Sequence, residues 1–149
     1  MSADDVLRTA LVAAIALGAF YMLLGGLMTR VSGRWRDGER IITLRQFGPF
    51  ISGDATRPGG WERYSGFALW NRVRIRRSDG GREYLESLGF AAEVAPLVEN
   101  QIMASFDLKL KGALLSGTFQ GRIVRSERRP PRIISVSLTP AKPRTWTRA

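Results

Sequence analysis

The sequence predicts a mainly β protein with one transmembrane helix near its N-terminus, and two observations support this fold class. Residues 9–29 form an apolar run of 21 residues without a charge, whereas after residue 30 short apolar segments alternate with turns that contain Gly or Pro. Seven or eight such segments in about 110 residues are typical of a single antiparallel β-barrel or β-sandwich. We therefore expect a short N-terminal tail (1–8), a transmembrane helix (9–29), a β-rich domain (30–140) and a basic C-terminal tail (141–149).

The apolar run has the length of a membrane span. As a helix it would extend roughly 31 Å, about the thickness of the hydrocarbon core of a bilayer. One alternative is the core helix of a soluble protein, and another is a cleaved signal peptide. A signal peptide is less favoured because Asp4 and Asp5 stand where a basic region would be needed, and because no small-x-small cleavage site follows.

The charges beside this run predict its orientation. Only Arg8 precedes it, whereas five arginines follow closely, namely Arg30, Arg34, Arg36, Arg40 and Arg45. By the positive-inside rule we expect an inner-membrane protein with its N-terminus outside and its C-terminal domain in the cytoplasm.

Small residues recur at four-residue spacing in the same helix, at Ala10, Ala14 and Gly18. Such a stripe allows the close approach of a second helix, so these residues are the candidate helix-packing site. The alternative is that Ala and Gly are simply frequent in membrane helices.

The β-rich domain divides at its turns. The predicted strands are residues 40–47, 50–55, 82–88, 102–111, 113–124 and 132–138, and residues 64–77 are predicted as one long strand or a bent pair of strands. Asp79-Gly80 predicts a type I′ hairpin that would pair Arg76 with Glu83. Residues 90–100 are ambiguous, because their apolar spacing is helical but Pro96 would disturb a helix interior, so we expect a short helix or an irregular crossover.

An internal similarity links two of the predicted hairpins. Residues 44–53 and 108–117 share the order Leu, basic, two residues, Gly, one residue, two apolar residues, Ser, Gly. The pattern predicts two similar β-hairpins with the first Gly at each turn, although chance similarity is an alternative.

The segments ITLRQFGPFISGD (42–54) and FDLKLKGALLSGTFQG (106–121) resemble strand pairs of lipocalin-like barrels, and Gly33-Arg34-Trp35 resembles the Gly-x-Trp entry of those proteins. The resemblance implies a small β-barrel and a lipophilic ligand, and no functional residue is carried over from it.

The net charge of +10 comes mostly from arginine. Arg72, Arg74 and Arg76 alternate with apolar residues, so on a strand they share one face, which either is solvated or meets anionic lipid or an acidic partner. A second cluster lies between residues 122 and 129. The candidate contacts with anionic lipid or an acidic partner are Arg72, Arg74, Arg76, Arg122, Arg125, Arg128 and Arg129.

The composition argues against catalysis. His and Cys are absent, which excludes thiol and imidazole chemistry, and the carboxylates are scattered. We therefore expect no enzymatic activity, no metal and no cofactor. Nucleic acid is not favoured as a partner, because the sequence contains no recognised binding motif and carries a membrane anchor.

These observations predict a structural, accessory or assembly subunit of a membrane protein complex, with anionic lipids and other transmembrane subunits as partners. The basic tail 141–149 would order on such a partner. The alternative is a membrane-tethered, lipocalin-like barrel that binds a lipid or another lipophilic ligand. Its candidate pocket residues, which would otherwise form a filled core, are Phe50, Phe67, Leu69, Phe106, Leu108 and Phe119.

Overall fold

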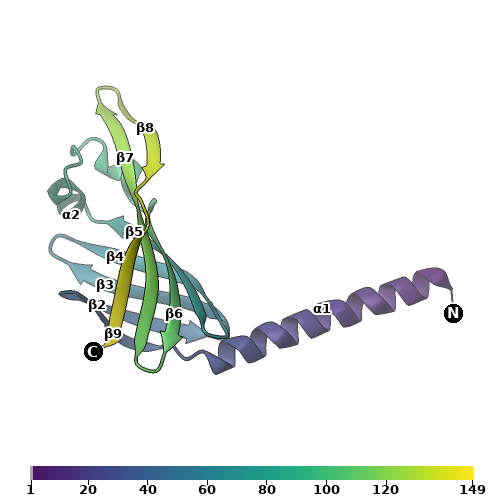
Figure 1. The fold of residues 1–149 in the computed structure, drawn as a ribbon. Helices are drawn as coiled ribbons and strands as arrows, with labels where there is room; N and C mark the ends of the chain where they lie inside the picture. The colour runs from purple at the N-terminus through teal and green to yellow at the C-terminus, as the bar shows by residue number, and fades with distance from the viewer. Residues whose placement is uncertain (1) are drawn as a thin grey trace.

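The computed structural model describes residues 2–149 and shows a long helix projecting from a β-barrel (Figure 1). Helix α1 spans Ala3–Met28 and begins six residues before the predicted span. The early start has a local cause, because Ser2 and Asp5 form a capping box in which the Ser2 hydroxyl accepts from the Asp5 amide at 3.2 Å. Most of the predicted N-terminal tail is therefore helical, and residue 1 of that tail lies outside the described residues.

Eight antiparallel strands close into a barrel, and one further strand extends it. The strands are β1 (Gly33–Asp37), β2 (Arg40–Phe47), β3 (Phe50–Arg57), β4 (Gly60–Leu69), β5 (Arg72–Gly80), β6 (Ile102–Lys111), β7 (Leu114–Arg128), β8 (Pro131–Leu138) and β9 (Lys142–Arg148). Strands β1 to β7 pair consecutively, and β9 closes the barrel by pairing with both β7 and β1. The predicted fold class is confirmed, and the structure is a barrel rather than a sandwich.

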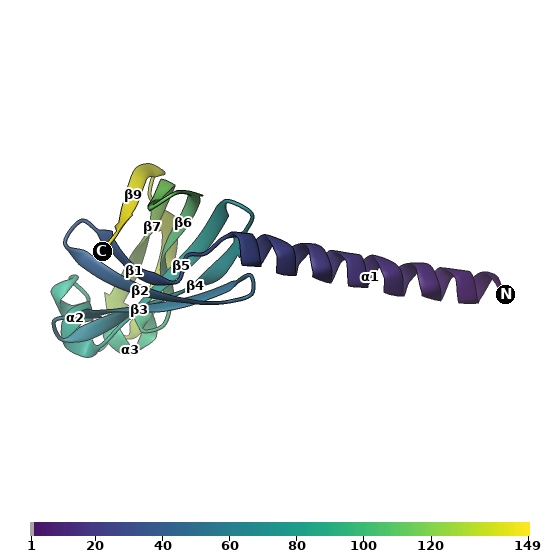
Figure 2. The ribbon, with the colours of Figure 1, turned by 90° about the horizontal axis from the view of Figure 1, so that it is seen from below.

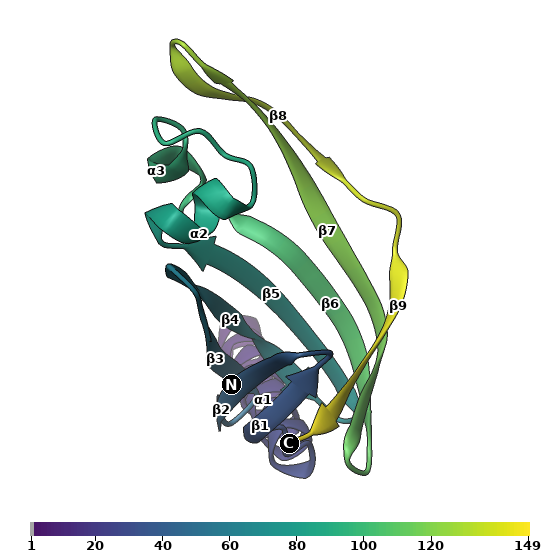
Figure 3. The same ribbon diagram turned by 90° about the vertical axis from the view of Figure 1, so that its left-hand side faces the viewer.

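The 15-residue strand β7 extends beyond the barrel wall. Its first half pairs with β9 and its second half pairs with β8. The two partner strands are consecutive in the chain and lie along the same edge of β7 (Figure 3). The part beyond the barrel is called the β7–β8 ribbon (residues 122–138). Residues 141–149, expected as a tail that orders on a partner, instead contain β9, whose Trp146 is completely buried in the barrel.

Two predictions of local structure are wrong. Asp79-Gly80 does not form a hairpin turn; β5 continues to Gly80, and residues 82–87 form helix α2 (Arg82–Ser87). Arg76 therefore faces Ser65 and Ser105 on neighbouring strands rather than Glu83. Residues 64–77, predicted as one long strand or a bent pair, belong to two strands, because a turn at Trp70 and Asn71 separates β4 from β5.

The ambiguous segment 90–100 contains a single short helix, α3 (Ala95–Val98). Pro96 is tolerated there because it occupies the first turn, where a backbone N–H has no partner within the helix. The helices α2 and α3 lie against one end of the barrel, and a small apolar cluster beneath them includes Leu85, Val94, Val98 and Met103.

The internal similarity corresponds to two hairpins of the same register. Gly48 and Gly112 lie at the turns with positive φ, and Leu44 faces Gly53 just as Leu108 faces Gly117. A third hairpin repeats the arrangement with Gly66 opposite Ile75. A Cβ on Gly53 would lie 2.6 Å from the side chain of Leu44, and one on Gly66 or Gly117 would collide with backbone of the neighbouring strand. The absence of a side chain at Gly53, Gly66 and Gly117 therefore lets adjacent strands approach each other closely at these positions.

The barrel interior is filled near α1. Trp35 and Trp146 are fully buried there together with Leu44, Val73 and Leu108. The aromatic rings of Phe106 and Trp146 are 4.9 Å apart, an edge-to-face contact that is favourable for packed rings. This core holds the barrel wall in a fixed shape, on which the outer surface features depend.

Candidate functional site

Helix α1 joins the barrel through two glycines. The carbonyl of Gly25 accepts from the Trp70 amide at 3.2 Å, and the carbonyl of Gly26 accepts from the Gln46 side chain at 2.8 Å. A Cβ on Gly26 would lie 2.6 Å from the backbone of Gly48 and Pro49, so only glycine allows this approach. The end of the helix is thus fixed between the tips of the β2–β3 and β4–β5 hairpins (Figure 2).

Neighbouring side chains strengthen this junction. The rings of Tyr21 and Trp70 lie 5.0 Å apart, and the Gln46 amide also donates to the Gly48 carbonyl at 2.8 Å. Trp70 has a positive φ of 56°, which places it at the hairpin tip in a conformation that turns usually assign to Gly or Asn. The helix and the barrel are therefore linked by specific contacts rather than by a free linker.

Apart from Gly25 and Gly26, the side chains of α1 are exposed. The helix is long and apolar enough to cross a membrane, by length and composition. An exposed apolar surface of this length is unfavourable in water, and its length matches the hydrocarbon core of a bilayer. The helix is not the buried core helix of a soluble protein, which was one alternative. The predicted packing residues Ala10, Ala14 and Gly18 lie in its exposed part.

A groove of about 920 Å³ crosses the outer surface of the barrel beside α1. It begins at Met22 of the helix and runs across β4, β5, β6 and β7 to Ala141. Two rows of outward-facing residues border it, and within each row the residues are cross-strand neighbours. One row is Phe67, Arg74, Asp107 and Thr118, and the other is Ser65, Arg76, Ser105 and Gln120. This feature is called the outer groove.

The predicted alternation of β5 is confirmed. Arg72, Arg74 and Arg76 are exposed on the outer face, and Val73 and Ile75 are buried on the inner face. Arg74 and Arg76 border the outer groove, where Arg74 lies 3.4 Å from the Asp107 carboxylate. Within residues 2–149, Arg72 and Arg76 form no ion pair.

The candidate pocket residues do not surround one internal cavity. Phe50 and Phe67 are exposed on the outside, and together with Leu69 they line the outer groove. Phe106 and Leu108 are in the filled core, where the Phe106 ring contacts Trp146, and Phe119 lines a separate cleft between the barrel wall and the α2–α3 segment. The sequence thus identifies three residues of a real concave surface, but that surface is on the outer side of the wall.

The second arginine cluster lies on the β7–β8 ribbon, far from α1 (Figure 1). Arg125 and Arg129 are exposed, Arg122 is half-buried, and Arg128 pairs with Glu93 at 3.0 Å. The ribbon also exposes apolar side chains along β8, where Ile134, Val136 and Leu138 are each more than half exposed. These arginines and the row of β5 therefore belong to two separate surfaces.

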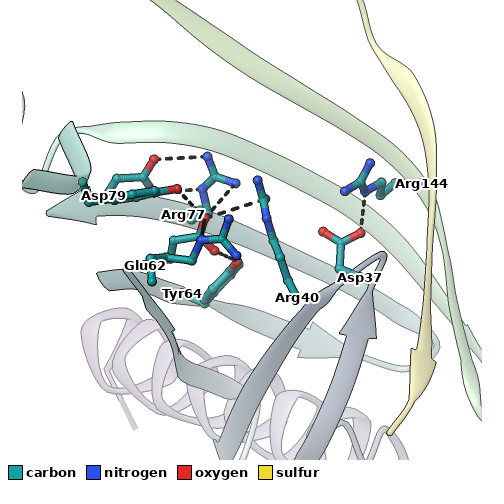
Figure 4. Close-up of polar contacts among 9 residues, drawn as sticks. Asp37, Arg40, Glu62, Tyr64, Arg77, Asp79 and Arg144 are labelled. Carbon is teal, nitrogen blue, oxygen red and sulfur yellow. Dashed lines mark hydrogen bonds and ion pairs between the residues drawn. The ribbon is translucent and has the colours of Figure 1, made fainter. Parts of the chain in front are cut away.

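A polar cluster lies inside the barrel at the end away from α1 (Figure 4). Its centre is Glu62, which is fully buried and accepts hydrogen bonds from the Tyr64 hydroxyl at 2.7 Å and the Tyr84 hydroxyl at 2.8 Å. Arg77 lies 3.7 Å from Glu62 and 2.9 Å from Asp79. This distal polar cluster comprises Arg40, Arg57, Glu62, Tyr64, Arg77, Asp79 and Tyr84.

The surroundings shift the acidities of this cluster. Burial alone would raise the pKa of Glu62, but Arg77, the two tyrosine hydroxyls and Arg40 outweigh it and hold that pKa below its usual range. Burial raises the pKa of Asp79, and Arg77 offsets the effect only in part. Burial and the Glu62 charge raise the pKa of Tyr64. Glu62 is therefore an ionised acceptor that is already fully occupied by donors.

The distal polar cluster connects side chains of four strands and of α2 at this end of the barrel. Both oxygens of Glu62 accept hydrogen bonds, and residues 2–149 hold no group of three acidic side chains that could bind a metal ion. A related pair joins the barrel seam, where Arg144 of β9 donates to the buried carboxylate of Asp37 on β1 (Figure 4). The sequence analysis did not identify Glu62, although its alternation with Tyr64 and Ala68 along β4 could have indicated an inward position.

Comparisons with known proteins found no relative of this chain. No protein-family model, no curated protein and no solved structure matches it. The function is therefore argued from the surfaces described above.

Proposed function

We propose that the protein is a non-catalytic, single-pass inner-membrane protein that acts as an accessory or assembly subunit of a membrane protein complex. In this proposal α1 spans the bilayer beside other transmembrane helices, and the barrel lies on the cytoplasmic surface. The exposed apolar length of α1 and the arginines that follow it support the membrane part.

The observation that carries the role as a subunit is the β7–β8 ribbon. Strand β8 is hydrogen-bonded only to β7, so within the described part of the chain its outer edge is unpaired. Soluble proteins usually protect such an edge, particularly when it bears apolar side chains. Here Ile134, Val136 and Leu138 are exposed, and Leu138 faces Arg122 in register, a combination that fits a partner with an apolar and acidic surface.

The test is purification of the full-length protein from its native membrane in a mild detergent, followed by mass spectrometry of what remains bound. We expect a stoichiometric membrane protein with the wild type, and its loss with Val136→Lys. Ser137→Lys is the matched control, because it adds the same charge on the same strand at the neighbouring exposed position. Equal retention of the partner by both variants, or no partner with the wild type, would contradict the proposal.

The same preparation tests the helix-packing residues. Ala10→Leu, Ala14→Leu and Gly18→Leu together should release the partner if this face of α1 packs on another helix. The control is Ala13→Leu, Ala16→Leu and Ala19→Leu, which adds the same side chain at three positions on roughly the opposite face. Release by the control alone would place the partner on the other face of α1.

Lipid binding, which the lipocalin resemblance implied, has a supporting observation on the outer surface of the barrel. The interior near α1 is filled, whereas the outer groove is open and contains both apolar and basic residues. A lipid contact at this groove is compatible with a role as a subunit.

A further inference from the structure

The outer groove changes chemical character along its length. At the end next to α1 it is apolar, and its lining there consists of Met22, Pro49, Phe50, Phe67 and Leu69. Arg74 and Arg76 follow in the middle, where Asp107 lies beside Arg74, and the uncharged polar residues Ser105, Thr118 and Gln120 complete the lining. An occupant that matches this order has an apolar part near the helix and an anionic part farther away.

We propose that the outer groove binds one anionic membrane lipid, with its headgroup at Arg74 and Arg76 and an acyl chain along Phe67 and Phe50 toward Met22. The inference rests on the proposed insertion of α1 in the bilayer. It goes beyond that proposal, because it names the occupant of a defined surface and the residues that select it.

The apolar end of the groove is continuous with the membrane-spanning helix. Met22 belongs to α1 itself, and its side chain is exposed, as are those of Phe50 and Phe67. Two exposed phenylalanines on the outside of a barrel are unfavourable in water, and an acyl chain that follows α1 out of the bilayer would cover them. The position of these rings beside the helix therefore indicates a lipid rather than a soluble ligand.

The middle of the groove requires a negative charge. Arg76 forms no ion pair within residues 2–149, and Arg74 shares only the partly exposed Asp107. Arg76 is flanked in register by Ser65 and Ser105, whose hydroxyls can donate to headgroup oxygens. A phosphate headgroup would supply the missing charge and accept these hydrogen bonds.

The test uses the full-length protein in detergent and native mass spectrometry with added phosphatidylglycerol or phosphatidylcholine of identical acyl chains. We expect the wild type to retain one phosphatidylglycerol in preference to phosphatidylcholine. Arg74→Gln with Arg76→Gln should weaken the binding about 30-fold, because each basic residue near an anionic lipid contributes roughly a fivefold factor. Arg34→Gln with Arg36→Gln is the matched control, since it removes the same charge from exposed positions on β1, across the barrel from β5.

A second pair of variants tests the groove without changing charge. Ser65→Trp places a large ring in the groove and should prevent lipid retention, whereas Thr147→Trp places it at an exposed position of β9, outside the groove, and should not. Near-ultraviolet circular dichroism of each variant confirms that the barrel is folded, so that a loss of lipid is assigned to the groove.

Three results would overturn the proposal: equal retention of phosphatidylcholine, an equal effect of the two arginine pairs, or binding of glycerol 3-phosphate as tight as that of the lipid. The last result would indicate a site for the phosphate group alone. Alkaline extraction of membranes separates this proposal from the preceding one. A protein that stays in the membrane but retains no phosphatidylglycerol fails only as a lipid site, whereas a protein that is extracted was not inserted.

Discussion

Glu62 is fully buried and is the acceptor on which the distal end of the barrel is organised. Three arginines from three strands, Arg40, Arg57 and Arg77, each place a nitrogen 3.7 Å from one of its oxygens. The two tyrosine hydroxyls are closer and satisfy both oxygens. The carboxylate therefore balances the positive charge of three arginines that come from separate strands. These strands are brought together only when the barrel closes.

Glu62→Gln should destabilise the barrel by about 3 kcal/mol, because it leaves buried or half-buried arginines without their shared counter-charge. The measurement is the free energy of unfolding of the full chain in detergent, followed by tryptophan fluorescence. Glu39→Gln is the control, since Glu39 is exposed near the same end of the barrel, and it should change the free energy of unfolding by less than about 0.5 kcal/mol. Similar values for both variants would contradict a central role for Glu62.

The pKa of Glu62 also predicts a dependence of stability on pH. Because this pKa lies below its ordinary value of 4.5 in the folded barrel, the stabilisation is complete above pH 4.5 and is lost as the pH falls through the lowered pKa. Asp79 acts in the opposite direction, since its pKa is raised. The free energy of unfolding should therefore decline less in Glu62→Gln than in the wild type between about pH 4.5 and 2.5. An equal decline would show that other carboxylates determine the acid response.

The end of α1 shows how an element is positioned by residues without side chains. Gly26 approaches Gly48 and Pro49 so closely that there is no space for a Cβ atom. At Gly18, in the same helix, an added Cβ would have no neighbouring atom within 4 Å. The two glycines have the same helix propensity but different surroundings. This difference allows the junction to be tested within one element.

Gly26→Ala should loosen the junction, because the added methyl group must displace the β2–β3 tip at a cost of about 1–3 kcal/mol. Arg30 follows the helix and is exposed, so the rate of trypsin cleavage after Arg30 reports on opening of the junction. We expect cleavage to be about tenfold faster in Gly26→Ala. Gly18→Ala should leave this rate unchanged, and equal rates in the two variants would show that the close approach does not fix the helix.

The sequence predicted those elements whose signal is local. The long apolar helix, the Gly48 and Gly112 hairpins and the alternation of β5 are all confirmed. The errors arose where long-range contacts decide the structure. Asp79 is not a turn residue because Arg77 pairs with it inside the barrel, and β9 forms because β7 and β1 offer it two edges and a buried position for Trp146.

For the candidate site, too, the sequence predicted some residues but not their arrangement in space. Period-two alternation placed Arg74 and Arg76 on an outer face, and aromatic content identified Phe50 and Phe67. Which side of the wall the aromatic residues occupy depends on the hairpin tip at Trp70 and Asn71; a bend within residues 64–77 was one alternative, but this tip contains no glycine and its position was not predicted. Moreover, the groove combines residues of α1 with residues of five strands, and no local pattern indicates such a combination.

The whole molecule has its surfaces in a definite order. The apolar helix lies at one end, the outer groove is beside the junction, and the basic ribbon extends from the far end of the barrel (Figure 1). In the proposed orientation the groove faces the bilayer and the ribbon reaches away from it. This order depends on which side of the membrane the barrel occupies.

The orientation is testable because the chain contains no cysteine. Ala3→Cys and Ser135→Cys place single thiols at exposed positions at opposite ends of the molecule. In right-side-out inner-membrane vesicles, a membrane-impermeant maleimide should label Ala3→Cys directly and Ser135→Cys only after permeabilisation. The reverse pattern would place the barrel outside, and labelling of both without permeabilisation would show that the helix does not span the bilayer.

In the proposed topology, the contacts at Gly25 and Gly26 connect the transmembrane helix rigidly to the barrel. A partner or a change in bilayer thickness that alters the tilt of α1 would also rotate the barrel, because no flexible linker lies between them. The motion would be largest at the tip of the β7–β8 ribbon, which lies farthest from the junction. Events within the membrane would therefore be transmitted as a displacement of the ribbon.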